Sequence, residues 1–143
     1  MGGRLVVVSN RIPTEAEPSG GLVVALHSTL CEKGGIWIGS HPELSEAPTS
    51  PLQKIGDETR YTRLAFQITQ REHEEFYLGF ANSVLWPVCH RRGDLVDLKR
   101  SFQTAYMEVN KRIARLIIDV IEADDLIWIQ DYHFFPLASE LRK

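Results

Sequence analysis

The sequence has only two cysteines among its 143 residues, Cys31 and Cys89, and they lie far apart. Their spacing matches no metal-binding or redox motif, so we expect ordinary buried or half-buried thiols. The five histidines form no HxxxH pair and no cluster with cysteine. We therefore expect no metal site in this chain and no other cofactor.

Long apolar runs and concentrations of one charge are also missing. No apolar stretch approaches the length of a membrane-spanning helix, and the N-terminus lacks a basic region followed by an apolar segment. The formal net charge is -3, and lysine and arginine are scattered rather than gathered in a stripe. These absences argue against membrane and nucleic-acid partners, and they predict a cytoplasmic globular protein.

Four short segments carry the aliphatic and aromatic residues of buried strands: 5–8, 36–38, 61–68 and 125–129. The first, Leu5-Val6-Val7-Val8, has no polar alternation, which is typical of a strand covered on both faces in a parallel sheet. Helices are expected between the strands, over 22–33, 70–80, 102–120 and 136–143. This alternation predicts an α/β fold: a Rossmann-like open sheet with mostly parallel strands and right-handed crossovers.

The last predicted helix has no stop signal before the sequence ends at Leu141-Arg142-Lys143. An open α/β sheet that ends in this way looks unfinished. We therefore expect residues 1–143 to form a single, incomplete domain of a truncated protein.

Polar residues follow two of the predicted strands, where a buried core has no need of them. Ser9-Asn10-Arg11 ends the first strand, and Asp131-Tyr132-His133 follows the last. Ligands of open α/β sheets bind beyond the carboxyl ends of the strands, and an arginine there presents a planar fork of donors to a phosphate. Gly20-Gly21 opens a helix, whose free N–H groups also favour an anion. Together these features predict one phosphate-binding site.

Each of these features also has a plain structural explanation. Gly20-Gly21 fits an ordinary turn, Arg11 fits a surface ion pair, and Asp131 fits a helix cap. The aromatic side chains of Phe76 to Trp86 fit a hydrophobic core. Only the joint occurrence of these features favours a ligand site over the separate explanations.

Five collinear motifs give the sequence a family resemblance. They are RLVVVSNRIP, SGGLVVAL, GGIWIG, ANSVLWPVCH and DDLIWIQDYHFFPLASELRK. Together they resemble the motifs of the trehalose-6-phosphate synthase family. Its members are retaining glycosyltransferases that join UDP-glucose to glucose 6-phosphate. The resemblance covers nearly the whole chain. It implies the N-terminal, acceptor-side domain of a two-domain GT-B enzyme, whose C-terminal nucleotide-sugar domain is absent here.

The resemblance also implies roles for individual residues. Arg11, Tyr77 and Asp131 would bind glucose 6-phosphate, and Gly20 and Gly21 would bind the UDP-glucose donor. Trp86 would help to select the anomer of the acceptor. Tyr132 and His133 would be further residues of the pocket. No metal is implied, because cation clamps in the absent half would stabilise the departing diphosphate. The chain alone is therefore expected to be inactive.

One departure from the family pattern leaves the acceptor open. Where many members carry WxGW, this chain has Trp37-Ile38-Gly39-Ser40, so one wall of the acceptor pocket differs. Related synthases that make glucosylglycerol phosphate, or pseudo-glycosyltransferases, share the scaffold with altered pockets. A non-catalytic module that binds a sugar phosphate or pairs with a full-length synthase is the other alternative. Homo-oligomer formation is left open as well.

Overall fold

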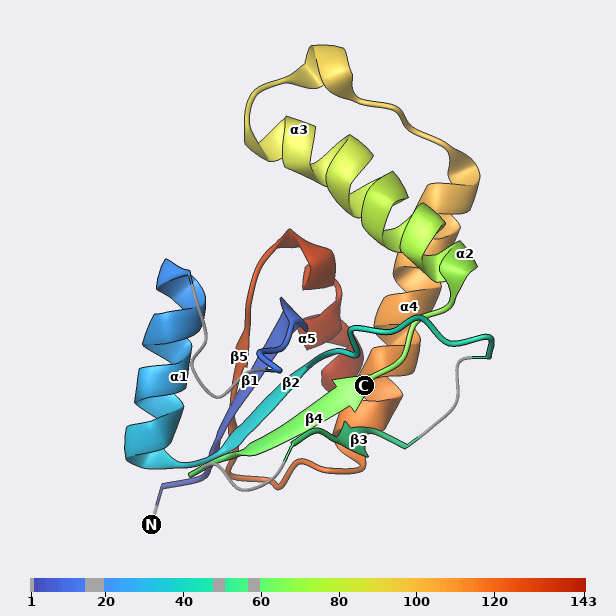
Figure 1. The fold of residues 1–143 in the computed structure, drawn as a ribbon. Helices are drawn as coiled ribbons and strands as arrows, with labels where there is room; N and C mark the ends of the chain where they lie inside the picture. Colours follow the sequence, from blue (N-terminus) through green and yellow to red (C-terminus); the bar gives the residue numbers. More distant parts are fainter. Residues whose placement is uncertain (1, 15–19, 48–50, 57–59) are drawn as a thin grey trace.

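The computed structural model describes residues 2–14, 20–47, 51–56 and 60–143, and its centre is an open five-stranded sheet (Figure 1). The strands lie in the order β3-β4-β2-β1-β5. Four of them run parallel: β1 (Leu5–Arg11), β2 (Ile36–Ser40), β4 (Thr62–Phe66) and β5 (Leu126–Ile129). The two-residue strand β3 (Gln53–Lys54) pairs antiparallel with β4 at the edge. The expected α/β fold with a mostly parallel sheet is confirmed.

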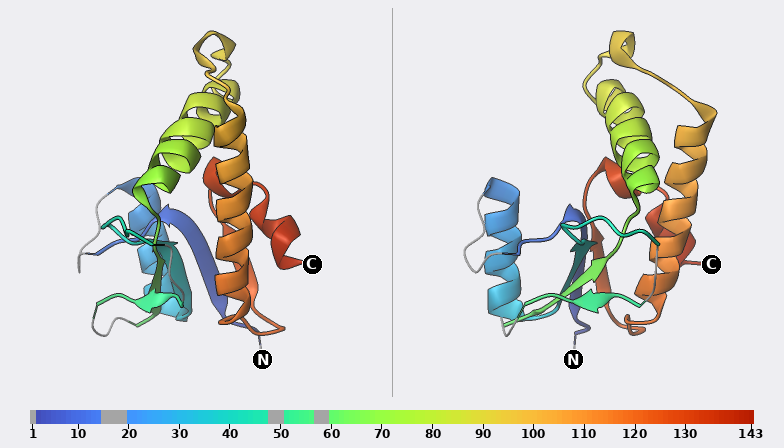
Figure 2. Two further views of the ribbon diagram at one scale, coloured as in Figure 1. Left: turned by 90° about the vertical axis from the view of Figure 1, so that its right-hand side faces the viewer. Right: turned by 45° about the vertical axis from the view of Figure 1, so that its right-hand side comes forward.

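The aliphatic run of β1 is buried on both faces of this sheet. Val7 belongs to a core formed with Leu26 and Leu30 of helix α1 (Gly21–Lys33), which covers one face. Val6 and Val8 belong to the larger core on the other face, which helix α4 (Arg100–Ile118) covers. Figure 2 shows α1 and α4 on opposite sides of the strands. Successive side chains of a strand point to opposite faces, so an unbroken apolar run is what this layering requires.

The helix that follows β4 is longer than the sequence indicates. We expected it to end at Phe80, but it continues through three consecutive parts: α2 (Gln70–Glu72), the π-helical η1 (His73–Leu85) and α3 (Trp86–Cys89). Pro87 has no N–H to donate to the carbonyl of Ser83, and the N–H of Asp97 donates to that oxygen instead, at 2.9 Å. Asp97 follows the short 3-10 helix η2 (Gly93–Leu95), so a residue outside the helix supplies the hydrogen bond that Pro87 cannot make.

The segment after β5 is tied to α4 by hydrogen bonds to its backbone. It contains the short 3-10 helix η3 (Tyr132–Phe134) and helix α5 (Leu137–Leu141), which lies within the range expected for the last helix. The hydroxyl of Tyr106 donates to the carbonyl of Tyr132 at 2.6 Å. The amide of Asn110 donates to the carbonyl of His133 at 3.1 Å. Buried groups of α4 therefore fix the chain directly beyond the end of β5.

The strand order places a topological switch between β1 and β5. The chain moves outward from β1 through β2 to β4, and then returns to pair β5 with the free side of β1. The strand order reverses at the boundary between β1 and β5. At such a point a crevice forms at the carboxyl ends of the two strands. The residues after β1 and after β5 face this crevice.

Candidate functional site

The parallel pairing of β1 and β5 brings the two predicted polar segments together. Val8 lies opposite Ile129 in the register, and the N–H of Gln130 donates to the carbonyl of Val8 at 2.8 Å. The next residues of both strands therefore reach the same edge of the sheet. Arg11 and Asp131 line one cavity of about 230 Å³, which we call the inner cavity. The two residues thus share one hollow, as the sequence predicts.

An irregularity in β1 aims the side chain of Arg11. Between Val8 and Arg11 the strand holds one more residue than the facing stretch of β2, from Ile38 to Ser40. Such a bulge bends a strand and redirects its side chains, and bulges recur beside active sites. The hydroxyl of Ser9 donates to the carbonyl of Arg11 at 2.6 Å and accepts from the indole N–H of Trp37 at 2.8 Å. These bonds hold the bulge in place.

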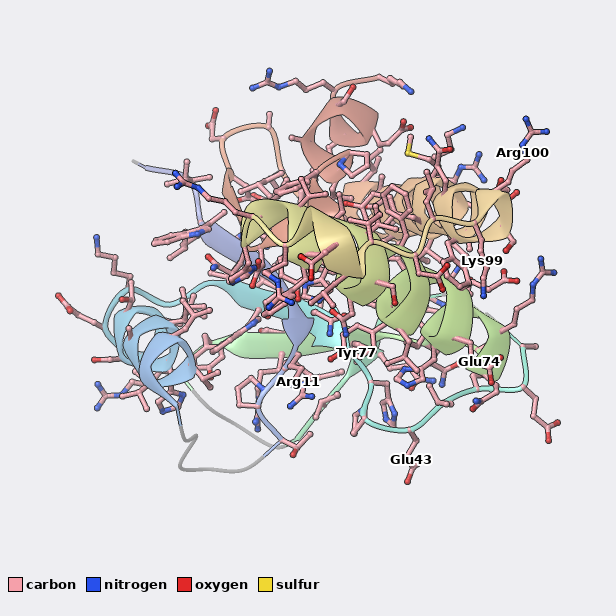
Figure 3. All side chains as sticks on the ribbon, turned by 90° about the horizontal axis from the view of Figure 1, so that it is seen from above. Arg11, Glu43, Glu74, Tyr77, Lys99 and Arg100 are labelled. Atoms are coloured by element: carbon pink, nitrogen blue, oxygen red, sulfur yellow. The ribbon has the colours of Figure 1, made fainter. Side chains whose placement is uncertain are left out.

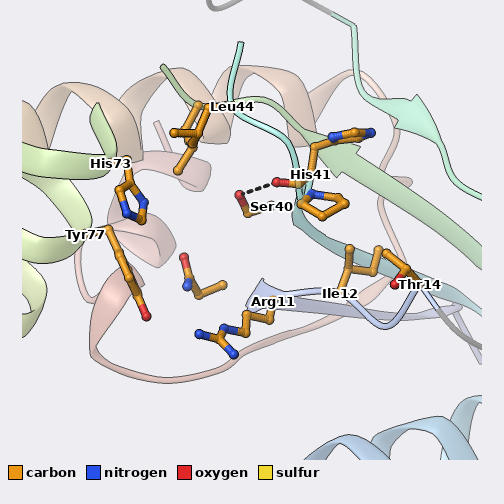
Figure 4. Close-up of a pocket in the computed structure, with 11 residues that line it drawn as sticks. Arg11, Ile12, Thr14, Ser40, His41, Leu44, His73 and Tyr77 are labelled. Carbon is orange, nitrogen blue, oxygen red and sulfur yellow. Dashed lines mark hydrogen bonds between the residues drawn. The ribbon is translucent and has the colours of Figure 1, made fainter. Parts of the chain in front are cut away.

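A second cavity of about 480 Å³, the outer cavity, lies on the other side of Arg11 and Tyr77. Asn10, Arg11 and Tyr77 line both cavities. Figure 4 shows the outer cavity bordered by Tyr77 and His73 on one side, Ser40 above and Arg11 below. Seen from above, Arg11 and Tyr77 come from different elements and lie near one another (Figure 3). Together the two cavities make a site of the size that binds small ligands.

The charge of the site favours an anion. Arg11 is exposed and has no hydrogen-bonded or ion-paired acid among the residues that the structure describes. No carboxylate occurs among the described residues that line the outer cavity, and Asp131 is the one carboxylate among those of the inner cavity. An unpaired guanidinium beside a tyrosine hydroxyl offers donors to phosphate oxygens. The surface ion pair, which was the alternative structural explanation for Arg11, is not found among the described residues.

Tyr77 is held in a column of four stacked rings, which we call the ring stack. Its ring centroid lies 5.2 Å from that of His73 and 5.6 Å from that of His133. His133 in turn stacks on Tyr132, at 4.3 Å between centroids. The hydroxyl of Tyr132 donates to the side-chain oxygen of Asn82 at 3.0 Å, which joins the stack to η1. Burial lowers the pKa of His133, so its imidazole is neutral near pH 7.

Asp131 combines a cap with a strained backbone. Its carboxylate oxygen Oδ1 accepts from the N–H of Tyr132 at 2.8 Å, so the cap that was the alternative explanation for Asp131 is present, on η3. Its φ of 78° and ψ of 169° fall in a region that essentially only glycine occupies. Strained residues of this kind cluster at active sites and ligand clamps. Asp131 is exposed and lines the inner cavity, and a carboxylate can accept from a ligand hydroxyl there.

Three other predicted residues lie outside the two cavities. Gly20 has a φ of 98° and precedes the first turn of α1, but neither it nor Gly21 lines a cavity, whereas their neighbours Leu22 and Val23 line the inner one. Trp86 is 39% exposed, stacks on His90 and lines neither cavity. The roles of Gly20 and Gly21 in binding the donor, and of Trp86 in selecting the acceptor anomer, remain predictions.

Sequence reasoning missed His73, which lines the outer cavity and stacks on Tyr77. The signal was present, because His73 and Tyr77 are four residues apart in a segment predicted to be helical, and such pairs lie on one face. Among the described residues, no group of three His, Cys, Asp or Glu side chains is placed to hold a metal ion. No helix formed by them is long and apolar enough to cross a membrane.

Comparison with known proteins identifies the family. The model of glycosyltransferase family 20 matches residues 4–143. The chain belongs to this family. It is 44% identical to the trehalose-6-phosphate synthase of Enterobacter sp. (strain 638), over 99% of this chain and 30% of that protein.

Solved structures of family 20 proteins share the fold. An E. coli structure described as trehalose-6-phosphate bound with UDP-2-fluoro glucose is 41% identical, with a TM-score of 0.86 over 97% of this chain and 30% of that one. A Burkholderia xenovorans trehalose-phosphate synthase in complex with glucose-6-phosphate is 33% identical, with the same TM-score of 0.86 and the same coverage. The present chain spans about 30% of the length of the curated relatives that it matches.

Proposed function

We propose that the protein carrying this chain transfers glucose from UDP-glucose to glucose 6-phosphate and forms trehalose 6-phosphate with retention of configuration. The observation that carries this proposal is the meeting of Arg11, Tyr77 and Asp131 around the inner cavity. These three residues come from β1, η1 and the turn after β5. Family membership and a relative solved with glucose-6-phosphate support the same acceptor.

In this proposal the described residues bind and orient the acceptor. The guanidinium of Arg11 and the hydroxyl of Tyr77 donate to phosphate oxygens, and the carboxylate of Asp131 accepts from a sugar hydroxyl. Because the cation binds the phosphate and the anion binds a hydroxyl, the acceptor should bind in one direction. Holding the acceptor hydroxyl against the donor carbon in this way replaces a bimolecular encounter with a prearranged one.

The transfer breaks the bond between the glucosyl carbon and UDP and forms a bond to the acceptor oxygen, whose proton leaves with UDP. The residues proposed for the donor are Gly20 and Gly21, at the start of α1. An added Cβ at either glycine would meet no described atom within 4 Å, and glycine lets a ligand approach the backbone without a Cβ in the way. No metal or other cofactor is part of this proposal.

The test is UDP release from UDP-glucose with glucose 6-phosphate as acceptor, in the protein at its full natural length. Charged hydrogen bonds contribute about 1.5–3 kcal/mol, so Arg11→Ala should raise the KM for glucose 6-phosphate roughly 10- to 100-fold. Arg92→Ala is the matched control, because Arg92 forms an exposed pair with Asp94 away from both cavities. Undiminished activity in both Arg11→Ala and Asp131→Ala would refute the proposed site.

The second candidate function is the same glucosyl transfer to a different, larger acceptor. It is favoured by Ser40, whose small side chain borders the outer cavity and leaves room beside Arg11. An acceptor larger than glucose 6-phosphate would occupy both cavities. A panel of sugar phosphates of increasing size tests this candidate with the wild type and Ser40→Trp. Loss of the larger acceptors alone in Ser40→Trp would support it, and an unchanged order of preference would reject it.

A further inference from the structure

The chain leaves β1 through residues 9–13, which we call the exit segment. This segment carries Arg11 to the edge of both cavities, so the place of the guanidinium depends on how the segment is held. Before Arg11, the hydroxyl of Ser9 accepts from an indole N–H of β2. After Arg11, the buried Ile12 packs so closely on β2 that a Cβ added at Gly39 would come within 2.9 Å of its own Cβ. The exit segment is therefore fastened to β2 on both sides of Arg11.

Arg63 of β4 fastens the far end of the exit segment. Its guanidinium nitrogen Nη1 donates to the carbonyl of Pro13 at 2.6 Å. Arg63 is the register partner of Trp37 in β2, so the two side chains leave the sheet on the same face. The hydrogen bond joins residues that lie 50 positions apart in the sequence, and it ends two residues beyond Arg11.

Arg63 occupies a position that an apolar side chain would normally fill. It is 6% exposed, and both its register partner Trp37 and the nearby Tyr61 belong to the core on the α1 face. Arginine is rarely buried to this extent, because removing a guanidinium from water is costly. The hydrogen bond to Pro13 gives a reason for keeping the arginine, since no apolar side chain could make it.

The connection between β3 and β4 leaves room for this guanidinium. Gly56 lies there with a φ of 71°, and an added Cβ would overlap the nitrogen Nη2 of Arg63. A larger residue at this position would have to displace the guanidinium. The end of the arginine is thus placed by the carbonyl of Pro13 and by the backbone at Gly56.

We propose that Arg63 is a positioning residue for the acceptor site: it holds the exit segment through Pro13 and thereby places the guanidinium of Arg11 for the phosphate of the acceptor. This inference rests on the proposed function, because Arg11 is the residue that it serves. Arg63 is not among the residues that line the two cavities, so it acts through Arg11 and not by touching the ligand. Ser9 fixes the exit segment before Arg11, and Arg63 fixes it after.

The decisive variant is Arg63→Met in the protein at its full natural length. Its KM for glucose 6-phosphate should rise about three- to tenfold, less than in Arg11→Ala, because Arg11 is present but no longer held. Its kcat should stay within about twofold of the wild type. Its Tm should stay close to that of the wild type, because methionine fills the core position and water can bond to the half-buried Pro13. Amide hydrogen exchange in a peptide that covers the exit segment should become faster.

A double-mutant cycle shows whether Arg63 acts through Arg11. If it does, Arg63→Met should not raise the KM for glucose 6-phosphate any further in a protein that already carries Arg11→Ala. A direct attraction between the charge of Arg63 and the phosphate would instead give the same fold-change with and without Arg11.

Arg4→Met is the matched control for the loss of a guanidinium. Arg4 also donates to a carbonyl outside the sheet, that of Val120 at 3.1 Å, but it does so at the opposite end of β1 and lines neither cavity. Its Tm should fall, because the pairing with Asp125 is lost as well. Its KM for glucose 6-phosphate should remain that of the wild type.

Gly56→Ala displaces the same guanidinium without replacing it, and it carries the test if Arg63→Met does not fold. This variant should also raise the KM for glucose 6-phosphate. Gly34→Ala is its matched control, because Gly34 has a similar φ of 74° and the nearest described atom to an added Cβ is the carbonyl oxygen of Arg60, at 3.8 Å. Both variants should lose stability to the backbone strain, but only Gly56→Ala should raise the KM.

Two results would overturn the inference. One is the wild-type KM for glucose 6-phosphate in both Arg63→Met and Gly56→Ala. The other is an equal fold-change from Arg63→Met with and without Arg11. If the wild type itself transfers no glucose, the proposed function fails separately. Calorimetric binding of glucose 6-phosphate and hydrogen exchange of the exit segment then test Arg63, and unchanged affinity or unchanged exchange in Arg63→Met would reject its role.

Discussion

The backbone strain at Asp131 can be measured by comparing two variants, Asp131→Gly and Asp131→Ala. Both remove the carboxylate, so both lose the cap on the N–H of Tyr132 and any contact with the acceptor. They differ in the backbone, because alanine retains a Cβ at a φ of 78° and a ψ of 169° while glycine adopts this conformation freely. Their difference in stability therefore isolates the strain.

The magnitude follows from two opposing effects. A non-glycine residue in this region costs about 1–3 kcal/mol. Glycine loses more conformational freedom on folding than alanine does, which costs about 0.5–1 kcal/mol. The Asp131→Gly protein should accordingly be more stable than the Asp131→Ala protein, by about 1 kcal/mol. An ordinary exposed position should show the reverse order.

The assay is denaturant unfolding of both proteins at their full natural length, with acceptor binding measured on the same samples. Asp119 supplies the control pair, because it is exposed with a φ of -70°, and there the alanine variant should be the more stable. Affinity for glucose 6-phosphate should fall equally in Asp131→Gly and Asp131→Ala. A glycine variant no more stable than the alanine variant would show that the backbone is unstrained, and the inference from strain to function would fail.

Two further predictions concern the framework of the sheet. Asp125 accepts from the backbone N–H and guanidinium of Arg4, and this pairing lowers its pKa to about 2 from 3.8. Asp125→Ala should lose about 1–2 kcal/mol of unfolding free energy at pH 7, and a pH titration should show the loss shrinking as the pH falls from 3.8 toward 2, where the wild-type carboxylate is protonated. Gly35→Ala should lower the free energy of unfolding by at least about 2 kcal/mol, because Gly35 has a φ of 125° and an added Cβ would overlap the carbonyl of Leu5. Gly93→Ala, where the space is open, should leave the midpoint of urea unfolding nearly unchanged, and equal midpoints for both variants would contradict the steric reasoning.

The parts of the fold that depend on local pattern were predictable from the sequence. The aliphatic run at Leu5 to Val8 indicated a strand buried on both faces, and the structure places it between β2 and β5, parallel to both. Once β1 and β5 are parallel neighbours, the polar residues after each strand must lie at one edge. The shared cavity of Arg11 and Asp131 follows from this topology without any knowledge of the side-chain contacts.

The parts that depend on distant partners were not predictable. The helix continues past Phe80 and through Pro87, where the N–H of Asp97 donates to the carbonyl of Ser83, and nothing in the local sequence indicates that partner. The ring stack likewise joins η1 to the segment after β5. Helical spacing is enough to put His73 beside Tyr77, but it does not predict the stacking of Tyr77 on His133. The bulge that aims Arg11 also became visible only in the strand register.

Two locally unfavourable features, a strained backbone and unpaired buried side-chain atoms, lie at the predicted site. A strained backbone at Asp131 and unpaired imidazole nitrogens at His133 occur within three residues, in a segment whose carbonyls are tied firmly to α4. A rigid framework can sustain such local costs, and they persist where the side chains serve a ligand. Arg11, which has no paired acid among the described residues, lines the same cavity. At Asp131 one substitution should therefore have two effects: replacement by glycine should relieve the backbone strain and should weaken the binding of the sugar phosphate.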